Sequence, residues 1–75
     1  MNSEFMAAQA NKFAARLEKG HGDEPDSLVE AGFLTAFGRP PSAEEKSKAL
    51  EFLSKSSLPR LCLLWFNMSE FLYVD

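Results

Sequence analysis

A break of five residues, Gly-Arg-Pro-Pro-Ser at positions 38–42, constrains this chain more than any other feature. Neither proline can continue a helix, and each disfavours helical geometry in the residue before it. Ser42 and Glu45 follow with the spacing of a capping box, in which each side chain satisfies the backbone amide of the other residue. The sequence therefore predicts a helix that Gly38 closes, a stiff connector, and another helix that begins just after Ser42.

Periodic apolar residues and turn signals extend this pattern to four helices, expected over residues 3–19, 25–37, 43–54 and 58–67. Gly20 is expected to end the first of them. Pro25 is expected to begin the second, because a proline at the first helical position loses no hydrogen bond. Gly32 lies on the apolar face of the second helix, where a missing side chain lets another helix approach closely.

A chain of 75 residues has room for one domain, so residues 1–75 are expected to form a single all-α bundle of four short helices. Hydrophobic residues make up 45% of the chain, which is enough to fold around one core. Residues 61–66 have no polar side, and a helix that is apolar all round is either central or covered by a partner. We expect this fourth helix to be central, wrapped by the other three, with the apolar tail 69–75 packed back on the bundle.

The charge balance is acidic, with eight Lys and Arg against eleven Asp and Glu and a formal net charge of −3. Domains that bind nucleic acid usually carry a basic excess. A helix-turn-helix nucleic-acid binder is therefore the disfavoured alternative function, suggested by short helices around a tight turn. The longest apolar run is far shorter than the ~18 residues of a membrane span. The first residues lack the layout of a signal peptide, which predicts a cytoplasmic location by default.

No group of residues has the spacing of a catalytic or metal site. His21 is the only histidine and lies between two glycines, and the nearby Asp23, Glu24 and Asp26 lack the spacing of a calcium-binding loop. Acidic residues at a helix start are explained by the helix dipole. Cys62 lies in the most apolar segment, where burial raises the pKa of a thiol and makes it inert. We therefore expect no enzyme activity, metal or cofactor. An enzyme or metal protein would need His21 or Cys62 to face a cleft and to have a perturbed pKa.

Two further motifs have ordinary structural explanations. Asn67, Met68 and Ser69 match the N-glycosylation pattern, but this pattern is common by chance and falls near the end of an apolar helix. Arg39 has the chemistry to bind an anion, and we expect it instead to cap carbonyl groups at the end of the second helix.

The fourth helix leaves apolar surface that so small a domain does not easily cover. Core packing is favoured for Trp65, yet three short helices cannot easily bury every side of a fourth. The predicted interaction surface is the exposed remainder, drawn from Leu63, Trp65, Phe66, Phe71 and Tyr73. The predicted function is a non-catalytic packing or protein-interaction module. Its expected partner is another protein, the remainder of a larger domain, or a second copy in a homodimer, with neither nucleic acid nor a membrane.

Three motifs of the chain resemble, in the same order, the PSD domain family of planctomycete bacteria, a large domain of unknown function. They are the opening 2–5 with 8–10, the junction 36–45 with 49–53, and the C-terminal stretch 61–67 with 69–75. The chain resembles only the last small piece of that large domain. Cytochrome-c-like segments often accompany the domain. The resemblance therefore implies a cell-envelope or redox-associated setting for relatives, and it assigns no activity to any residue here.

Overall fold

The computed structural model describes the backbone of residues 3–69 and the side chains of residues 4–68, and within that range it contains helices and no strand. The helices are α1 (Ser3–His21), α2 (Pro25–Phe37), α3 (Ala43–Lys55) and α4 (Leu58–Ser69). The all-α fold is confirmed. The bounds of α2 are as expected, and the other helices end one or two residues later than expected. The tail beyond Ser69, expected to pack on the bundle, lies outside the described residues.

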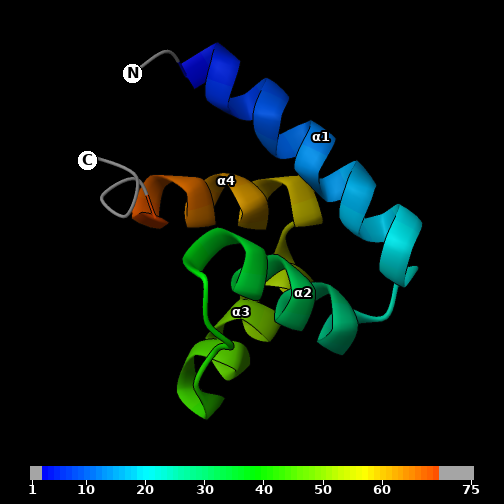
Figure 1. Ribbon diagram of the computed structural model, residues 1–75, viewed down its shortest axis with the longest axis vertical. Coiled ribbons are helices and arrows are strands. Elements are labelled where there is room, and N and C mark those ends of the chain that lie inside the picture. Colours follow the sequence, from blue (N-terminus) through cyan, green and yellow to red (C-terminus); the bar gives the residue numbers. More distant parts are fainter. Residues whose placement is uncertain (1–2, 70–75) are drawn as a thin grey trace.

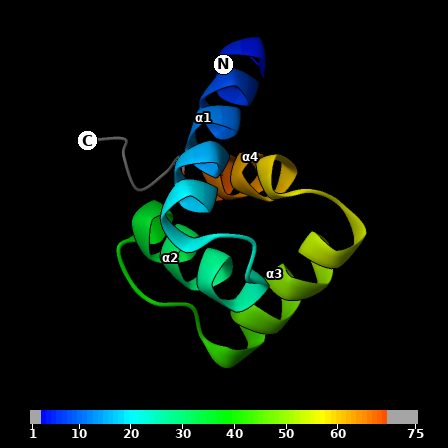
Figure 2. The ribbon, with the colours of Figure 1, turned by 90° about the vertical axis from the view of Figure 1, so that its right-hand side faces the viewer.

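The helices form two stacked pairs, α1 with α4 and α2 with α3 (Figure 1, Figure 2). α1 packs most extensively on α4, although these two helices lie furthest apart in the sequence. α2 and α4 each contact all three of the other helices. None of the described helices is long and apolar enough to cross a membrane.

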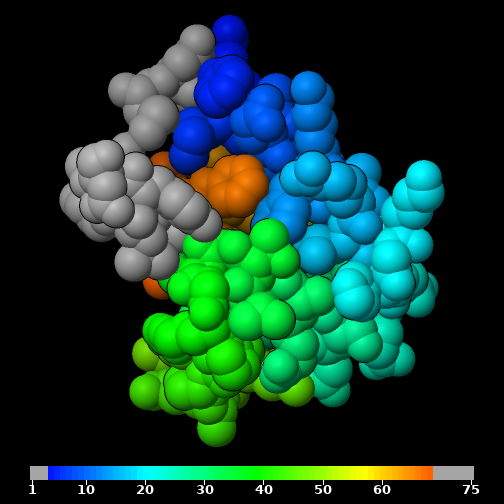
Figure 3. All heavy atoms as spheres, in the orientation of Figure 1, coloured from blue at the N-terminus to red at the C-terminus, as the bar shows by residue number. Residues whose placement is uncertain are grey.

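α4 is central, as expected, but its cover is incomplete. Atoms of α4 remain visible between α1 and α2 on the face shown in Figure 3. On α4, Leu64 is 39% exposed and Met68 is 56% exposed. The exposed remainder expected on the fourth helix of so small a domain is therefore present, and α3 packs on α4 less extensively than α1 and α2 do.

The core is one cluster of buried hydrophobic residues with members on all four helices. Two aromatic contacts join the helices across it. Phe13 of α1 stacks on Phe66 of α4 with ring centroids 5.4 Å apart, and Phe33 of α2 meets Trp65 of α4 edge-on at 6.1 Å. α3 contributes only Ala49 to the buried set. Because α3 is so lightly embedded, the space beside it is the natural place for a surface groove.

Gly32 lets α2 and α4 approach closely, as the sequence predicted. A Cβ atom at this position would stand 2.5 Å from Cζ3 of Trp65 and 3.0 Å from Cδ1 of Leu17. Both distances are shorter than an ordinary van der Waals contact between carbon atoms. The indole therefore fills the space that any larger residue at position 32 would need.

The capping box at the start of α3 forms as expected. Ser42 Oγ accepts a hydrogen bond from the Glu45 N–H at 3.1 Å, and Glu45 Oε1 accepts one from the Ser42 N–H at 2.8 Å. These bonds satisfy two backbone donors that a helix start would otherwise leave unpaired. The beginning of α3, and with it one wall of the groove described below, is thereby fixed.

Arg39 does not cap α2, contrary to expectation. At the end of α2, Gly38 takes a left-handed φ of 76° and donates its N–H to the Leu34 carbonyl at 2.8 Å. The Arg39 guanidinium instead donates two hydrogen bonds, of 2.8 and 2.9 Å, to the carboxylate of Glu45. A two-pronged pair of this kind matches the planar geometry of both groups, and the Pro-Pro connector brings them together.

α1 ends at a different glycine from the one expected. Gly20 stays helical, whereas Gly22 takes a left-handed φ of 70° and donates its N–H to the Glu18 carbonyl at 2.8 Å. His21 is therefore the last residue of α1 rather than a loop residue. A helix end needs only one left-handed residue, and either glycine could supply it.

Candidate functional site

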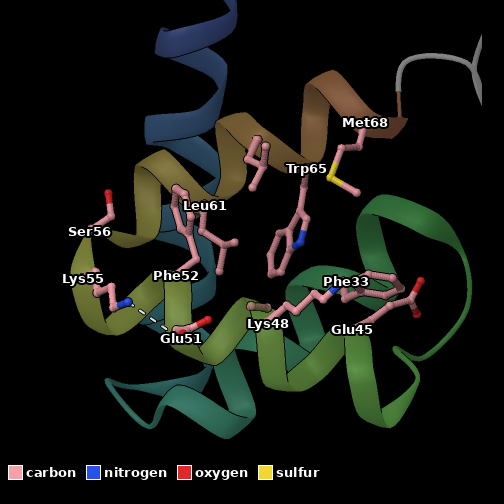
Figure 4. Close-up of a pocket in the computed structure, with 12 residues that line it drawn as sticks. Phe33, Glu45, Lys48, Glu51, Phe52, Lys55, Ser56, Leu61, Trp65 and Met68 are labelled. Atoms are coloured by element: carbon pink, nitrogen blue, oxygen red, sulfur yellow. Dashed lines mark ion pairs between the residues drawn. The ribbon is translucent and has the colours of Figure 1, made fainter.

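An apolar groove of about 690 Å³ lies between α3 and α4 (Figure 4). We call it the α3–α4 groove. Its apolar lining consists of Phe33, Ala49, Phe52, Leu61, Leu64, Trp65 and Met68. The floor is firm, because Phe33, Leu61 and Trp65 are all core residues with at most 3% of their surface exposed. The lip on α4 is open, since Leu64 and Met68 are the exposed members.

The spacing of residues along α4 explains this groove. Leu61, Leu64, Trp65 and Met68 recur at intervals of three and four, which places them on one stripe of the helix. Across from this stripe, α3 presents the small side chain of Ala49 and no larger buried residue. The two helices therefore meet without filling the space between them.

The α3 rim of the groove is charged but internally paired. Lys48 Nζ lies 3.8 Å from Glu44 Oε2, and Lys55 Nζ lies 3.5 Å from Glu51 Oε2. Both pairs join residues four apart on α3, and both are exposed, so they contribute little to stability. The lining residues that α4 supplies carry no charge. The groove therefore suits an apolar occupant better than a charged one.

Glu45 lies at the end of the groove nearest the start of α3, and its carboxylate is held by Arg39. The hydrogen bonds from Arg39 and from the Ser42 backbone lower the pKa of Glu45 to about 2. The same pair raises the pKa of Arg39. The guanidinium also lies over the ring of Phe33, 5.1 Å from its centroid. Arg39 thus connects the start of α3 to the groove floor.

A second group of charges holds α3 on α2. Lys46 Nζ lies 3.1 Å from Asp26 Oδ1 and 3.1 Å from Glu30 Oε2. The hydrogen bonds to Glu30 and then to Asp26 raise the pKa of Lys46. Asp26 thus serves as an ion-pair partner as well as an acid in the first turn of α2. These contacts orient α3, which forms one wall of the groove.

The structure separates the residues of the predicted interaction surface. Trp65 is 3% exposed and belongs to the core, where the space left by Gly32 receives its ring, and it also lines the floor of the α3–α4 groove. Leu63 and Phe66 are half-buried and pack against the core. The other two members, Phe71 and Tyr73, lie outside the described residues.

Sequence reasoning missed Leu64 and Met68, which are more exposed than any residue it selected within the described range. The signal was present in the spacing of the stripe that also contains Leu61 and Trp65. This spacing could not be recognised in the sequence because the neighbouring positions are apolar too. No polar residue indicates which side of α4 faces the solvent.

The chemical candidates lie apart from the groove lining. Cys62 is fully buried, and burial raises the pKa of its thiol to about 12, with the charge of Glu18 adding to the shift. The thiol therefore stays protonated near neutral pH. His21, Asp23 and Glu24 are exposed. Within the described part of the chain, no three His, Cys, Asp or Glu residues gather as metal ligands would.

The chain matches no known family model, and neither the curated proteins nor the solved structures contain a significant match to it. The resemblance to the planctomycete PSD domain thus rests on the sequence motifs, and it stays a prediction.

Proposed function

We propose that this domain is a non-catalytic protein-interaction module that binds an apolar segment of a protein partner in the α3–α4 groove. The observation that carries the proposal is the exposure of Leu64 and Met68 beside a floor of buried aromatic and aliphatic side chains. Large apolar side chains exposed together usually mark an interface.

The size and chemistry of the groove support binding. A volume of about 690 Å³ falls within the usual range of ligand-binding clefts in proteins. Amphipathic helical peptides are commonly recognised in this way, with apolar anchors laid into a hydrophobic groove. The apolar floor supplies affinity, and the charged α3 rim stays in contact with solvent.

The charges of the lining favour binding over catalysis. The charged residues that line the groove are Glu45, Lys48, Glu51 and Lys55. Each of them is engaged in an ion pair, with Arg39, with Glu44 or with one another. An acid or base catalyst needs a group that is free to exchange a proton with a substrate. An apolar floor with a paired rim is better suited to holding a side chain than to reacting with it.

Selection from a displayed peptide library, followed by titration of the selected peptides, tests the proposal. Trp65 is the sole tryptophan and lines the groove, so its fluorescence reports binding. Leu64→Glu places a charge on the lip and is expected to weaken binding by roughly 10-fold to 150-fold, the equivalent of the ~1.5–3 kcal/mol for burying a leucine.

Leu34→Glu is the matched control. Leu34 is 50% exposed on α2 and does not line the α3–α4 groove, so this variant is expected to bind as the original chain does. Circular dichroism checks that both variants fold. The proposal is wrong if the selected peptides bind the two variants equally well, or if the library yields no peptide whose binding depends on Leu64.

A further inference from the structure

The end of α4 borders the α3–α4 groove. Met68 lines the groove, and α4 ends one residue later at Ser69. Residue 70 is therefore only two positions in the sequence after Met68, a residue of the groove lining. The rest of the stripe on α4 extends back from Met68 through Leu64 to Leu61, so a segment that reversed direction after Ser69 would run along it.

Residues 70–75 are long enough for this path. The stripe from Leu61 to Met68 covers roughly 10 Å, because a helix rises 1.5 Å per residue. Six extended residues span up to about 20 Å. A turn after Ser69 therefore leaves sufficient length to reach the far end of the stripe.

The composition of residues 70–75, Glu-Phe-Leu-Tyr-Val-Asp, also fits the groove. Four consecutive apolar residues match the uncharged floor, and the acids at the two ends would lie at its edges. Lys55 lines the groove near the end of α3, and its exposed pair with Glu51 is weak enough to leave it available to a second carboxylate.

We propose that residues 70–75 fold back into the α3–α4 groove of their own chain, so that a protein partner must displace them. This inference rests on the proposed function, since it takes the groove to be a binding site. A covalently attached segment has an effective concentration in the millimolar range. Even a weak intrinsic affinity therefore keeps the groove occupied until a stronger ligand arrives.

The test uses the full chain with Phe71→Ser and Tyr73→Ser together, which removes two large apolar side chains from the segment. The matched control carries Phe5→Ser and Leu34→Ser, two exposed apolar residues that do not line the groove. A groove closed nine-tenths of the time weakens binding of an added peptide about 10-fold. The library-selected peptide is therefore expected to bind the first variant about 10-fold more tightly than the original chain, and the control no more tightly.

A direct measurement accompanies the titration. Nuclear Overhauser effects between the Tyr73 ring and the methyl groups of Leu64 are expected in the original chain, at intensities that do not change with dilution. Effects that disappear on dilution, together with a dimer by light scattering, would place the segment in a second copy and overturn the proposal. Absence of these effects, with equal peptide binding by all variants, would also overturn it.

The two proposals fail in different ways. If the selected peptide loses affinity with Leu64→Glu yet binds the Phe71→Ser, Tyr73→Ser variant no better, the groove is a binding site that the chain's own segment does not occupy. If Leu64→Glu has no effect on any peptide, the proposed function itself is wrong.

Discussion

Replacing Gly32 by alanine tests the closest helix contact in the molecule. Two terms oppose each other. Alanine in place of glycine inside a helix stabilises it by up to ~1 kcal/mol. The new Cβ would stand 2.5 Å from Cζ3 of Trp65, and inserting a methyl group into a filled core costs ~1–3 kcal/mol. Trp65 is 3% exposed and meets Phe33 edge-on, so its ring has little room to move aside. The net expectation is a loss of roughly 0–2 kcal/mol.

Gly20→Ala isolates the overpacking term. Gly20 is also helical, and a Cβ there would meet no atom within 4 Å, so only the favourable helix term applies. The difference between the two variants therefore equals the overpacking cost, ~1–3 kcal/mol. In thermal unfolding this is at least ~4 °C between their midpoints, because 1 kcal/mol shifts the midpoint of a domain this small by about 4–8 °C.

The Trp65→Phe background provides a second check. Two of the three atoms nearest the added Cβ, Cζ3 and Cη2, belong to the indole and are absent from phenylalanine, so the penalty of Gly32→Ala should shrink in that background. Equal stabilisation by Gly20→Ala and Gly32→Ala in the original chain would refute the close approach of α2 and α4 at Gly32.

The helix cap of α3, the Arg39–Glu45 ion pair and the buried thiol of Cys62 give three further predictions. Ser42→Ala removes the cap of α3 and should lower the free energy of unfolding in urea by about 1 kcal/mol; the same loss from Ser47→Ala, an exposed position inside α3, would argue against the cap. Because the pKa of Glu45 is lowered to about 2 from its ordinary 4.5, its ion pair with Arg39 stabilises the fold above pH 4.5 and is lost as the pH falls toward 2. Acid unfolding of Glu45→Gln should therefore show a weaker pH dependence there, and an unchanged profile would contradict this. The Cys62 thiol, with a pKa of about 12, should react with a disulfide reagent at about pH 8 only when the chain unfolds; labelling of the folded protein at the rate of free cysteine would disprove its burial.

Local features of the fold could be predicted from the sequence because the interacting residues lie close together along the chain. The bounds of α2 and the capping box of Ser42 with Glu45 depend on groups only a few residues apart. Arg39 shows where this reasoning fails. Its side chain had two sets of acceptors nearby, the last carbonyls of α2 and the carboxylate of Glu45. The choice between them follows from the direction of the Pro-Pro connector, which a residue pattern does not specify.

The candidate site was harder to predict because it depends on contacts between distant segments. Every position from 61 to 66 is apolar, so nothing in that run distinguishes the stripe facing the groove from the side facing α1. Trp65 is buried because Gly32, on another helix, leaves space for its ring. Leu64 and Met68 are exposed because α3, on the opposite side of the groove, buries only Ala49 fully and leaves the larger Phe52 half-buried. These outcomes are set by how the helices assemble.

The packing of α1 on α4 has a consequence for how the protein is made. The first and last described helices share the most extensive interface, with Phe13 stacked on Phe66. On the ribosome, α1 emerges long before its cover, whereas α2 and α3 can form a local hairpin early. Contacts between such distant segments form late in folding. A nascent chain that lacks α4 therefore leaves Phe13 without Phe66, and until synthesis passes α4 it presents apolar surface of α1 to chaperones and to neighbouring nascent chains.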